Sequence, residues 1–124
     1  LGAQCVALCD VYEPNLQLAQ KDSPPDAKPY VDYNDLLAQK GIDCVVIGTP
    51  DHQHMPNLFA SLKAGKDVYL EKPLSMTLEE SRQMVEAVRR TDRIVEIGMH
   101  RRVCRSYSPP RRWSTTAHSA ASRW

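Results

Sequence analysis

The sequence has no apolar run long enough to cross a lipid bilayer. Its longest runs, such as Cys44-Val45-Val46-Ile47, have the length of a strand, whereas a membrane-spanning helix needs about 20 apolar residues. The start, LGAQCVALCD, also lacks the basic segment and the long apolar core of an export signal. We therefore expect a cytoplasmic protein without a membrane segment, while the start at Leu1 leaves open an export signal further upstream.

Cysteine pairs with metal-ligand spacing are also missing. The chain has four cysteines and no Cys-x-x-Cys motif. Cys5, Cys9 and Cys44 fall inside apolar runs, where a free cysteine behaves as a small apolar side chain. This pattern favours a reducing, intracellular setting over a disulfide framework or a metal site.

Histidine spacing likewise gives no metal site. His52 and His54 flank Gln53 at an expected helix start, but no third ligand follows at a suitable spacing. We therefore predict no bound metal. Because a helix N-terminus disfavours the imidazolium, we expect neutral, hydrogen-bonding histidines.

What the chain does contain is typical of one globular domain. Its 124 residues are 25% charged and 42% hydrophobic, with a formal net charge of +1. Strand-length apolar runs alternate with helical patterns. Strands are expected over residues 5–9, 43–47, 67–70 and 93–99; helices over 14–21, 33–41, 51–65 and 78–90; and a polar loop after Pro24-Pro25. The alternation predicts an α/β fold with a parallel sheet covered by helices on both faces, and residues 43–47 as a strand buried on both faces.

Local signals set the ends and the inner faces of these helices. The expected caps are Asn34 or Asp35, Asp51, and Thr77 in a capping box with Glu80, and the expected stops are Gly41 and Gly65. The expected inward-facing side chains are Leu58, Phe59 and Leu62 in one helix, and Leu78, Met84, Val85 and Val88 in another.

Small, polar or charged residues follow each predicted strand where it ends. These residues are Asp10, Thr49 and Pro50, Glu71 and Lys72, and finally His100 and Arg101. In an open parallel sheet, ligands bind beyond the carboxyl ends of the strands. Each residue also has an ordinary structural alternative, since Asp10 can simply begin a turn and Lys72 can be a solvated surface lysine.

Taken in order, these motifs carry a family resemblance over about residues 3–102. The segments GTPDHQHMPNLFASLKAGKDVYLEKPLSMTLEESRQMVEAV and VEIGMHRR resemble the nucleotide-binding domain of the Gfo/Idh/MocA oxidoreductases. Glu71-Lys72-Pro73 matches the EKP signature of that family, TPDHQH its turn after the fourth strand, and GMHRR the segment after its sixth strand.

The resemblance implies an enzyme that uses NAD, or NADP, to transfer hydride to or from a sugar or cyclitol. Asp10 would bind a ribose hydroxyl, which favours NAD. The other implied cofactor-binding residues are Thr49, Pro50, His52, His54, Glu71, Lys72, His100 and Arg101. Lys72 would also be catalytic, with its ammonium hydrogen-bonded to the reacting oxygen of the substrate. The intact parent enzyme would be a homo-oligomer.

Two parts of such an enzyme are absent from this sequence. A glycine-rich phosphate loop would lie roughly 20 residues before Asp10, and the second, mostly β domain would follow the nucleotide-binding domain. Residues 1–102 are therefore expected to form an incomplete Rossmann-like sheet without its first strand, inactive alone. A non-catalytic nucleotide-binding or regulatory module is the alternative.

The last segment, residues 103–124, has a different composition. No Asp or Glu occurs from Ile97 onward, and arginine, serine and proline dominate. We expect an irregular, disordered tail, and the abrupt change suggests a shifted reading frame or a truncated gene product. A nucleic-acid-binding tail is a weaker alternative, because the segment is short and has no recognisable fold.

Overall fold

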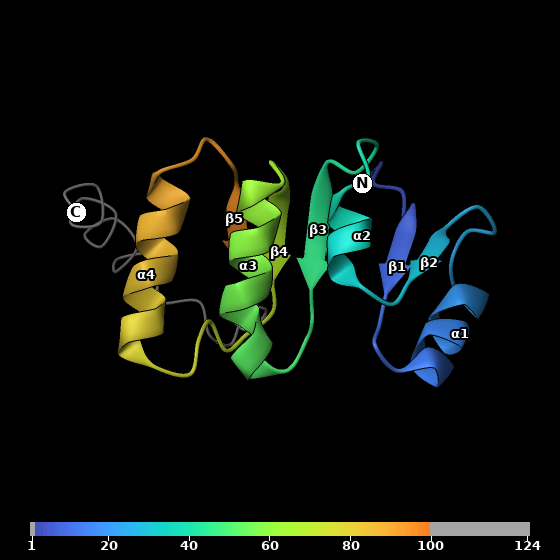
Figure 1. Cartoon of the computed structure of the whole chain (residues 1–124), viewed down its shortest axis with the longest axis horizontal. Coiled ribbons are helices and arrows are strands. Elements are labelled where there is room, and N and C mark those ends of the chain that lie inside the picture. Colours follow the sequence, from blue (N-terminus) through green and yellow to red (C-terminus); the bar gives the residue numbers. More distant parts are fainter. Residues whose placement is uncertain (1, 100–124) are drawn as a thin grey trace, which may run out of the picture.

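The computed structural model describes residues 2–99 (Figure 1). His100, Arg101 and the predicted irregular tail lie outside these described residues. Within them, no helix is both long enough and apolar enough to cross a membrane.

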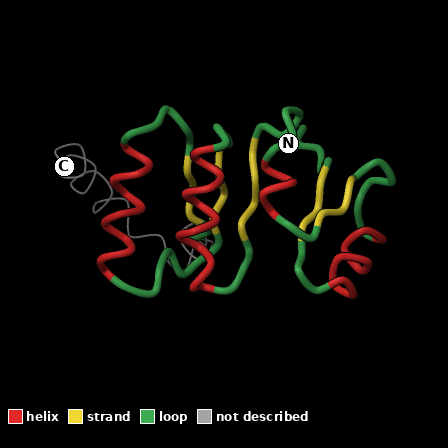
Figure 2. The backbone as a smooth tube through the Cα atoms, viewed as in Figure 1, coloured by secondary structure: helices red, strands yellow, loops and turns green. Residues whose placement is uncertain are grey.

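Strands and helices alternate along the described part of the chain (Figures 1 and 2). The strands are β1 (Ala7–Cys9), β2 (Lys28–Tyr30), β3 (Cys44–Ile47), β4 (Asp67–Leu70) and β5 (Val95–Ile97). The helices are α1 (Glu13–Lys21), α2 (Tyr33–Leu37), α3 (His54–Lys63) and α4 (Leu78–Arg89), with a 3₁₀ turn, η1 (Asp51–Gln53), before α3. The predicted α/β class is confirmed.

All strand pairs are parallel, but they form two sheets. One sheet has the order β1-β2 and the other has the order β3-β4-β5. A doubly wound domain commonly has the strand order 3-2-1-4-5-6. The two sheets fit this order on either side of its first strand, as expected for an incomplete Rossmann-like sheet.

The hydrophobic core lies on one face of the β3-β4-β5 sheet. The core residues are Ile47, Val68 and Leu70 from the strands, Leu58 and Leu62 from α3, and Met84 from α4. In the register of the sheet, Val46, Tyr69 and Glu96 lie side by side on the opposite face. Val46 is 74% exposed there, so the prediction of a strand buried on both faces was wrong. The described helices α3 and α4 cover only one face of this sheet, although helices were expected on both.

The cysteines are also more exposed than expected of small core residues. Cys5, Cys9 and Cys44 are free and exposed. Cys9 and Cys44 belong to β1 and β3, the strands of the two sheets that face each other in Figure 1. The described residues cover these side chains too little to bury them, although the Cys9 thiol is partly covered.

Strand β2 lies in the segment that was expected to be a polar loop. Lys28, Pro29 and Tyr30 pair with residues of β1. Proline has no backbone N–H, so it normally argues against a strand, but it is tolerated at a sheet edge. Because β2 is the last strand of its sheet, Pro29 does not interrupt a ladder on both sides.

Two helix caps differ from the prediction. Helix α2 begins after Asp32, whose carboxylate accepts a hydrogen bond from the Asn34 N–H at 2.8 Å, and it ends at Leu37, well before Gly41. Asp51 makes no capping hydrogen bond, because it lies within the 3₁₀ turn instead of before it. Helix α3 then ends at Lys63, close to the predicted stop at Gly65.

Helix α4 confirms its predicted start and corrects its predicted inner face. Thr77 and Glu80 form the full capping box, and Met84 is buried. Leu78 and Val85 are exposed, because α4 turns only the stripe around Met84 and Val88 toward the core.

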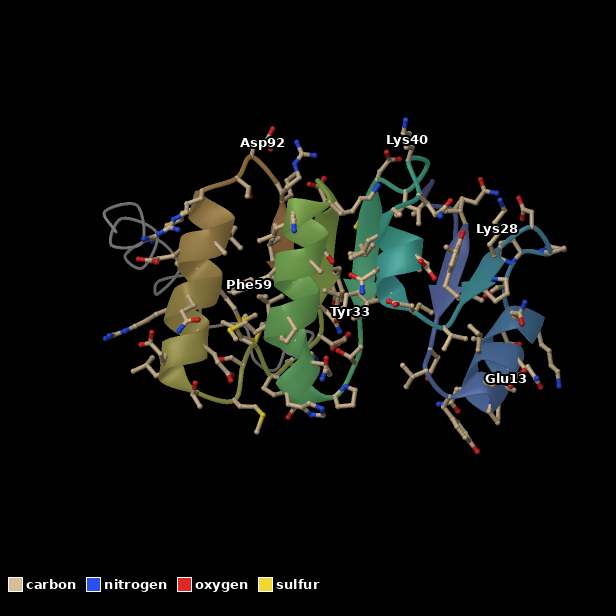
Figure 3. The ribbon with its side chains drawn as sticks, viewed as in Figure 1. Glu13, Lys28, Tyr33, Lys40, Phe59 and Asp92 are labelled. Atoms are coloured by element: carbon tan, nitrogen blue, oxygen red, sulfur yellow. The ribbon has the colours of Figure 1, made fainter. Side chains whose placement is uncertain are left out.

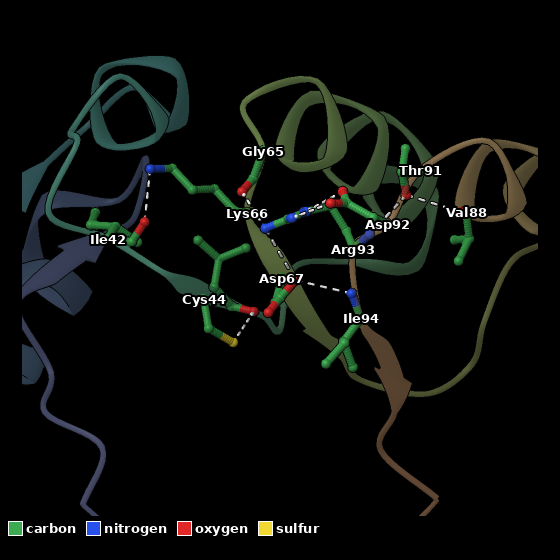
Figure 4. A network of polar contacts seen from close by, with 11 residues as sticks. Ile42, Cys44, Gly65, Lys66, Asp67, Val88, Thr91, Asp92, Arg93 and Ile94 are labelled. Carbon is green, nitrogen blue, oxygen red and sulfur yellow. Dashed lines mark hydrogen bonds and ion pairs between the residues drawn. The ribbon is translucent and has the colours of Figure 1, made fainter.

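A polar network fixes the edge of the sheet at which the strands begin (Figure 4). The buried Lys66 ammonium donates to the backbone carbonyl oxygens of Gln39 and Ile42 at 2.7 and 2.8 Å. The Asp67 carboxylate accepts from the Ile94 N–H at 2.9 Å. These contacts tie the start of β4 to the loop before β3 and to the approach to β5. Lys40 and Asp92 mark the same edge (Figure 3).

Candidate functional site

The opposite edge, where the strands end, carries the predicted site residues. Asp10 follows β1, Thr49 and Pro50 follow β3, and Glu71 and Lys72 follow β4. Because the strands within each sheet are parallel and β1 and β3 point the same way in Figure 1, these turns lie at one edge. The structure thus gathers the strand-end residues from residues 2–99 along a single side of the molecule.

Asp10 has a local structural role and a capacity for further contacts. Its two carboxylate oxygens accept from the Tyr12 N–H at 2.8 Å and from the Asn15 side-chain amide at 3.4 Å. Both donors lie at the start of α1, whose N-terminus favours a negative charge. A carboxylate has about four acceptor positions, so two hydroxyl groups of a ligand can still be accepted.

The charge around Asp10 affects its neighbour Cys9. Partial burial of the Cys9 thiol is the largest cause of a raised pKa, and the nearby carboxylates of Asp32 and Asp10 act in the same direction. The thiol lies 3.7 Å from the Val31 carbonyl oxygen. A raised pKa leaves less thiolate at a given pH, so this thiol is a poor nucleophile.

We expect Asp10→Asn to speed alkylation of Cys9 by iodoacetamide at pH 8 by roughly two-fold. The substitution removes one of the carboxylates that disfavour the thiolate but keeps an oxygen acceptor for Tyr12. Fragment mass spectrometry of the alkylated peptide resolves Cys9 from Cys5, which serves as the internal control. An unchanged Cys9 rate would show that the Asp10 charge does not reach the thiol.

His54 connects two of the strand-end turns. Its side chain is buried at the start of α3, and its ring nitrogens Nδ1 and Nε2 lie 2.7 Å from the Pro73 carbonyl oxygen and 2.9 Å from the Thr49 carbonyl oxygen. The neutral imidazole expected from the sequence has one N–H and can donate to only one of these carbonyl groups, whereas an imidazolium has two and can donate to both. In either form, His54 holds the turn after β3 against the turn after β4.

Asn57 extends this contact but was not recognised in the sequence. Its side-chain amide donates to the Thr49 hydroxyl oxygen at 3.2 Å. Its own oxygen, Oδ1, is buried and has no hydrogen-bond partner within residues 2–99. His54, Asn57 and Ser61 recur at a spacing that puts polar residues on one face of an otherwise apolar helix. That spacing is the feature of the sequence from which Asn57 could have been recognised.

Pro50 and His52 lie on the surface of the same turn. Pro50 precedes η1, and its carbonyl oxygen accepts from the Gln53 N–H at 2.8 Å. His52 is exposed, unlike His54. The two histidines of the DHQH motif therefore have different environments, and only His52 presents its ring to solvent.

Glu71 is placed by the sheet and by a glycine. Its N–H donates to the Ile47 carbonyl oxygen at 2.9 Å, which continues the β3-β4 ladder past Leu70. A Cβ atom at position 98 would lie 3.0 Å from both Glu71 Oε2 and Tyr69 Oη. Gly98 therefore leaves the space into which the carboxylate and the hydroxyl converge. Tyr69 and Gly98 were not predicted as site residues.

Lys72 projects from the same turn into solvent. Its side chain is exposed, and it forms no ion pair within the described part of the chain. The peptide bond between Lys72 and Pro73 is cis. The ammonium is thus a positive charge beside the Glu71 carboxylate, at the edge where the strands end.

Neither of two surface hollows includes a predicted site residue. One lies between α4 and the covered face of the sheet, with Leu58, Met84 and Ile97 in its wall. The other lies near the start of β1, with Val6 and Ile42 in its wall. Residues 2–99 also contain no group of three or more side chains suited to hold a metal.

A parallel sheet interrupted at its switch point, with polar turns at the carboxyl ends of its strands, defines a dinucleotide-binding α/β domain. Residues 2–99 match the oxidoreductase family with an NAD-binding Rossmann fold, Gfo/Idh/MocA, and the chain belongs to this family. The resemblance seen in the sequence is confirmed.

Among its relatives, an inositol 2-dehydrogenase from Salmonella typhimurium is 35% identical over 107 residues, which cover 86% of this chain and 32% of that protein. A glycosyl hydrolase family 109 protein from Shewanella putrefaciens is 32% identical over 100 residues, covering 74% and 22%. The chain thus spans about a third or less of the length of these curated relatives.

Solved structures agree with the fold. A probable dehydrogenase from Thermotoga maritima superposes with a TM-score of 0.77 at 31% identity, over 83% of this chain and 31% of that one. The WlbA dehydrogenase from Bordetella pertussis, in complex with NADH and UDP-GlcNAcA, superposes with a TM-score of 0.75 at 29% identity, over 81% and 28%.

Proposed function

We propose that this chain is part of the cofactor domain of an NAD-dependent oxidoreductase that acts on a hydroxyl or carbonyl group of a sugar or cyclitol. The observation that carries this proposal is the placement of Asp10, Thr49 and the Glu71-Lys72 pair at the carboxyl ends of parallel strands, at the same edge of the two sheets, in a chain that matches this family. The similarity to an inositol 2-dehydrogenase and to the WlbA dehydrogenase in complex with NADH and UDP-GlcNAcA supports the substrate class.

The described residues fit two parts of a dinucleotide but not the third. Asp10 has free acceptor positions for ribose hydroxyls, and Glu71 and Lys72 offer opposite charges at the end of β4 for the nicotinamide ribose and the substrate. A pyrophosphate needs backbone N–H groups at a helix N-terminus, and residues 2–99 provide no glycine-rich turn of that kind. We therefore expect NAD to bind this chain weakly.

Each site residue then has a definable task. The bound nicotinamide supplies the hydride chemistry. Lys72 would donate a hydrogen bond to the reacting oxygen and stabilise the negative charge that develops on it. His54 and Asn57 would position the site residues, because they hold the turns that contain Thr49 and Pro73. Pro50, His52, His100 and Arg101 complete the proposed cofactor-binding set.

The remaining proposals concern the whole protein. We place residues 1–102 in the partial dinucleotide-binding domain, and we propose a homo-oligomeric, cytoplasmic parent enzyme. A non-catalytic nucleotide-binding module would present the same edge to a nucleotide, but it would have no turnover that replacement of Lys72 could lower. The match to an oxidoreductase family, whose signature includes Lys72, favours the enzyme.

We expect millimolar NAD to shift the backbone amide NMR signals of Asp10, Thr49, Glu71 and Lys72, with an affinity weaker than micromolar. The amides of Lys40 and Asp92, at the other edge of the sheet, are the internal control. Asp10→Ala should weaken the shifts, while Asp92→Ala should not. Micromolar or tighter binding, or shifts centred on Lys40 and Asp92, would contradict the proposed site.

A further inference from the structure

Two buried side chains of α3 hold a single exposed residue, Thr49. The His54 imidazole lies 2.9 Å from the Thr49 carbonyl oxygen, and the Asn57 amide donates to the Thr49 hydroxyl oxygen at 3.2 Å. His54 is 1% exposed and Asn57 is 7% exposed, whereas Thr49 lies at the surface after β3. Both the backbone and the side chain of Thr49 are therefore fixed from inside the molecule.

The contact with Asn57 determines what the Thr49 hydroxyl can do. A hydroxyl has one proton to donate and two lone pairs that accept. The Asn57 amide occupies a lone pair of Oγ1, so the hydroxyl proton is free to be donated, and it goes to no acceptor within residues 2–99. Other hydroxyl groups in that part of the chain donate to backbone carbonyl oxygens, namely those of Ser23, Ser61, Ser75 and Thr91.

Asn57 lowers the stability of the fold. Its Oδ1 is buried and has no hydrogen-bond partner among the described residues, and an unpaired buried polar atom destabilises a protein. The reverse orientation of the amide would be worse, because it would leave two N–H donors unpaired in place of one oxygen. Leucine has a similar size and a higher helix propensity than asparagine. An apolar residue would therefore suit this position of α3 better, which points to a role of Asn57 other than stability.

Thr49 lies on the same side of the edge as Lys72. Strand β3 pairs with β4, and the His54 ring contacts both the Thr49 and the Pro73 carbonyl oxygens. Pro73 directly follows Lys72, whereas Asp10 follows β1 of the other sheet. Because Lys72 serves the nicotinamide end in the proposed enzyme, the Thr49 hydroxyl is nearer to the nicotinamide half of the dinucleotide than to the adenosine half.

We infer that Asn57 is a positioning residue that makes the Thr49 hydroxyl a donor to an acceptor oxygen of the nicotinamide nucleotide. That oxygen belongs to the ribose or to the phosphate attached to it, since both accept hydrogen bonds. This role of Asn57 rests on the proposed NAD-dependent function and deepens it. Asn57 itself touches no cofactor atom and acts only through Oγ1 of Thr49.

The test compares variants of the 124-residue chain by the NAD-induced shifts of their backbone amide NMR signals. Thr49→Val keeps the shape of the side chain and removes the hydroxyl, and Asn57→Leu removes the amide behind it. We expect either substitution to weaken NAD binding roughly five-fold, the usual net value of one hydrogen bond. The double variant should bind no more weakly than Thr49→Val alone, because Asn57 acts through Oγ1. Thr49→Ser keeps the hydroxyl and should bind NAD like the unmodified chain.

Thermal unfolding separates this role from a merely structural one. Asn57→Leu should raise the thermal midpoint by about 4 °C, although it weakens NAD binding. If Asn57 only supported the fold, its replacement would lower both. The matched control is Ser61→Ala, on the same face of α3, because the Ser61 hydroxyl donates to the Asn57 carbonyl oxygen of its own helix and not to Thr49. This variant should leave NAD binding unchanged.

Fragments of the dinucleotide locate the acceptor oxygen. Asn57→Leu should reduce the shifts caused by millimolar nicotinamide mononucleotide but not those caused by AMP. Nicotinamide riboside lacks the phosphate, so an equal reduction with the riboside assigns the acceptor to the ribose, and no reduction assigns it to the phosphate. A reduction with AMP alone would overturn the placement of Thr49 beside the nicotinamide half.

Three results would overturn the role of Asn57: unchanged NAD binding of Asn57→Leu, a further loss of binding in the double variant, or a lower thermal midpoint of Asn57→Leu. In each case, NAD-induced shifts of the Asp10 and Lys72 amides in the unmodified chain would leave the proposed function standing. Absence of those shifts would overturn the proposed function and the role of Asn57 together, so the two failures are distinguishable.

Discussion

Replacing Leu70 with alanine should lower the free energy of unfolding by about 3–5 kcal/mol, as for other fully buried leucines. Leu70 has an exposed fraction of 0% and lies in the middle of the core cluster. Its register partners, Ile47 and Ile97, belong to β3 and β5, so its side chain joins all three strands of the sheet to α3 and α4. The smaller side chain would leave a cavity that these packed elements cannot close.

Urea unfolding followed by circular dichroism measures this loss. The matched control is Val46→Ala in the neighbouring strand, where the side chain is 74% exposed on the opposite face. That substitution should change the free energy of unfolding by no more than about 0.5 kcal/mol. Equal losses in the two variants would mean that the core does not lie on the face that α3 and α4 cover.

The contrast between Leu70 and Val46 also shows what the sequence could and could not predict. Both residues lie in apolar runs, and the runs correctly predicted strands β3 and β4. A run of apolar residues does not reveal whether each face of its strand is covered, because the cover comes from other parts of the chain. For Val46 that cover is not among residues 2–99, so the expected burial on both faces was wrong.

Local chemistry was predicted best where it is complete within a few residues. The Thr77-Glu80 capping box needs only the spacing of two side chains along one turn, and it forms as expected. Strand β2 was not predicted, because Lys28-Pro29-Tyr30 has neither the length nor the composition of a typical strand. Its pairing with β1 overrides those weak local preferences.

In the candidate site, too, the residues with local sequence signals were predicted and the long-range contacts were not. Asp10, Thr49 and Lys72 could be proposed from the sequence, because each follows a recognisable strand and such ends share one edge of a sheet. Gly98 could not be linked to Glu71, since their contact depends on the pairing of β4 with β5. The same holds for His54 and the Pro73 carbonyl, which lie 19 residues apart in the chain.

The Glu71-Lys72 pair gives the sharpest test of the proposed chemistry. In a full-length protein that carries a phosphate loop and a substrate domain, Lys72→Met should lower kcat roughly a hundred-fold or more, with little change in NAD affinity. The ammonium would stabilise charge that is present mainly in the transition state, so its loss affects turnover more than binding. Methionine keeps much of the length of the side chain and removes the charge.

Two controls separate this effect from a general loss of positive charge or of structure. Lys40→Met removes an exposed lysine at the opposite edge of the sheet (Figure 3) and should leave turnover unchanged. Glu71→Gln should have a smaller effect than Lys72→Met, because it keeps the neighbouring ammonium and an oxygen acceptor. Steady-state kinetics at saturating substrate, with NAD affinity from calorimetry, measures both parameters. Near-normal turnover of the Lys72→Met enzyme would leave Lys72 as an ordinary surface lysine. An exposed side chain that touches no reacting atom can lose its charge without lowering the rate.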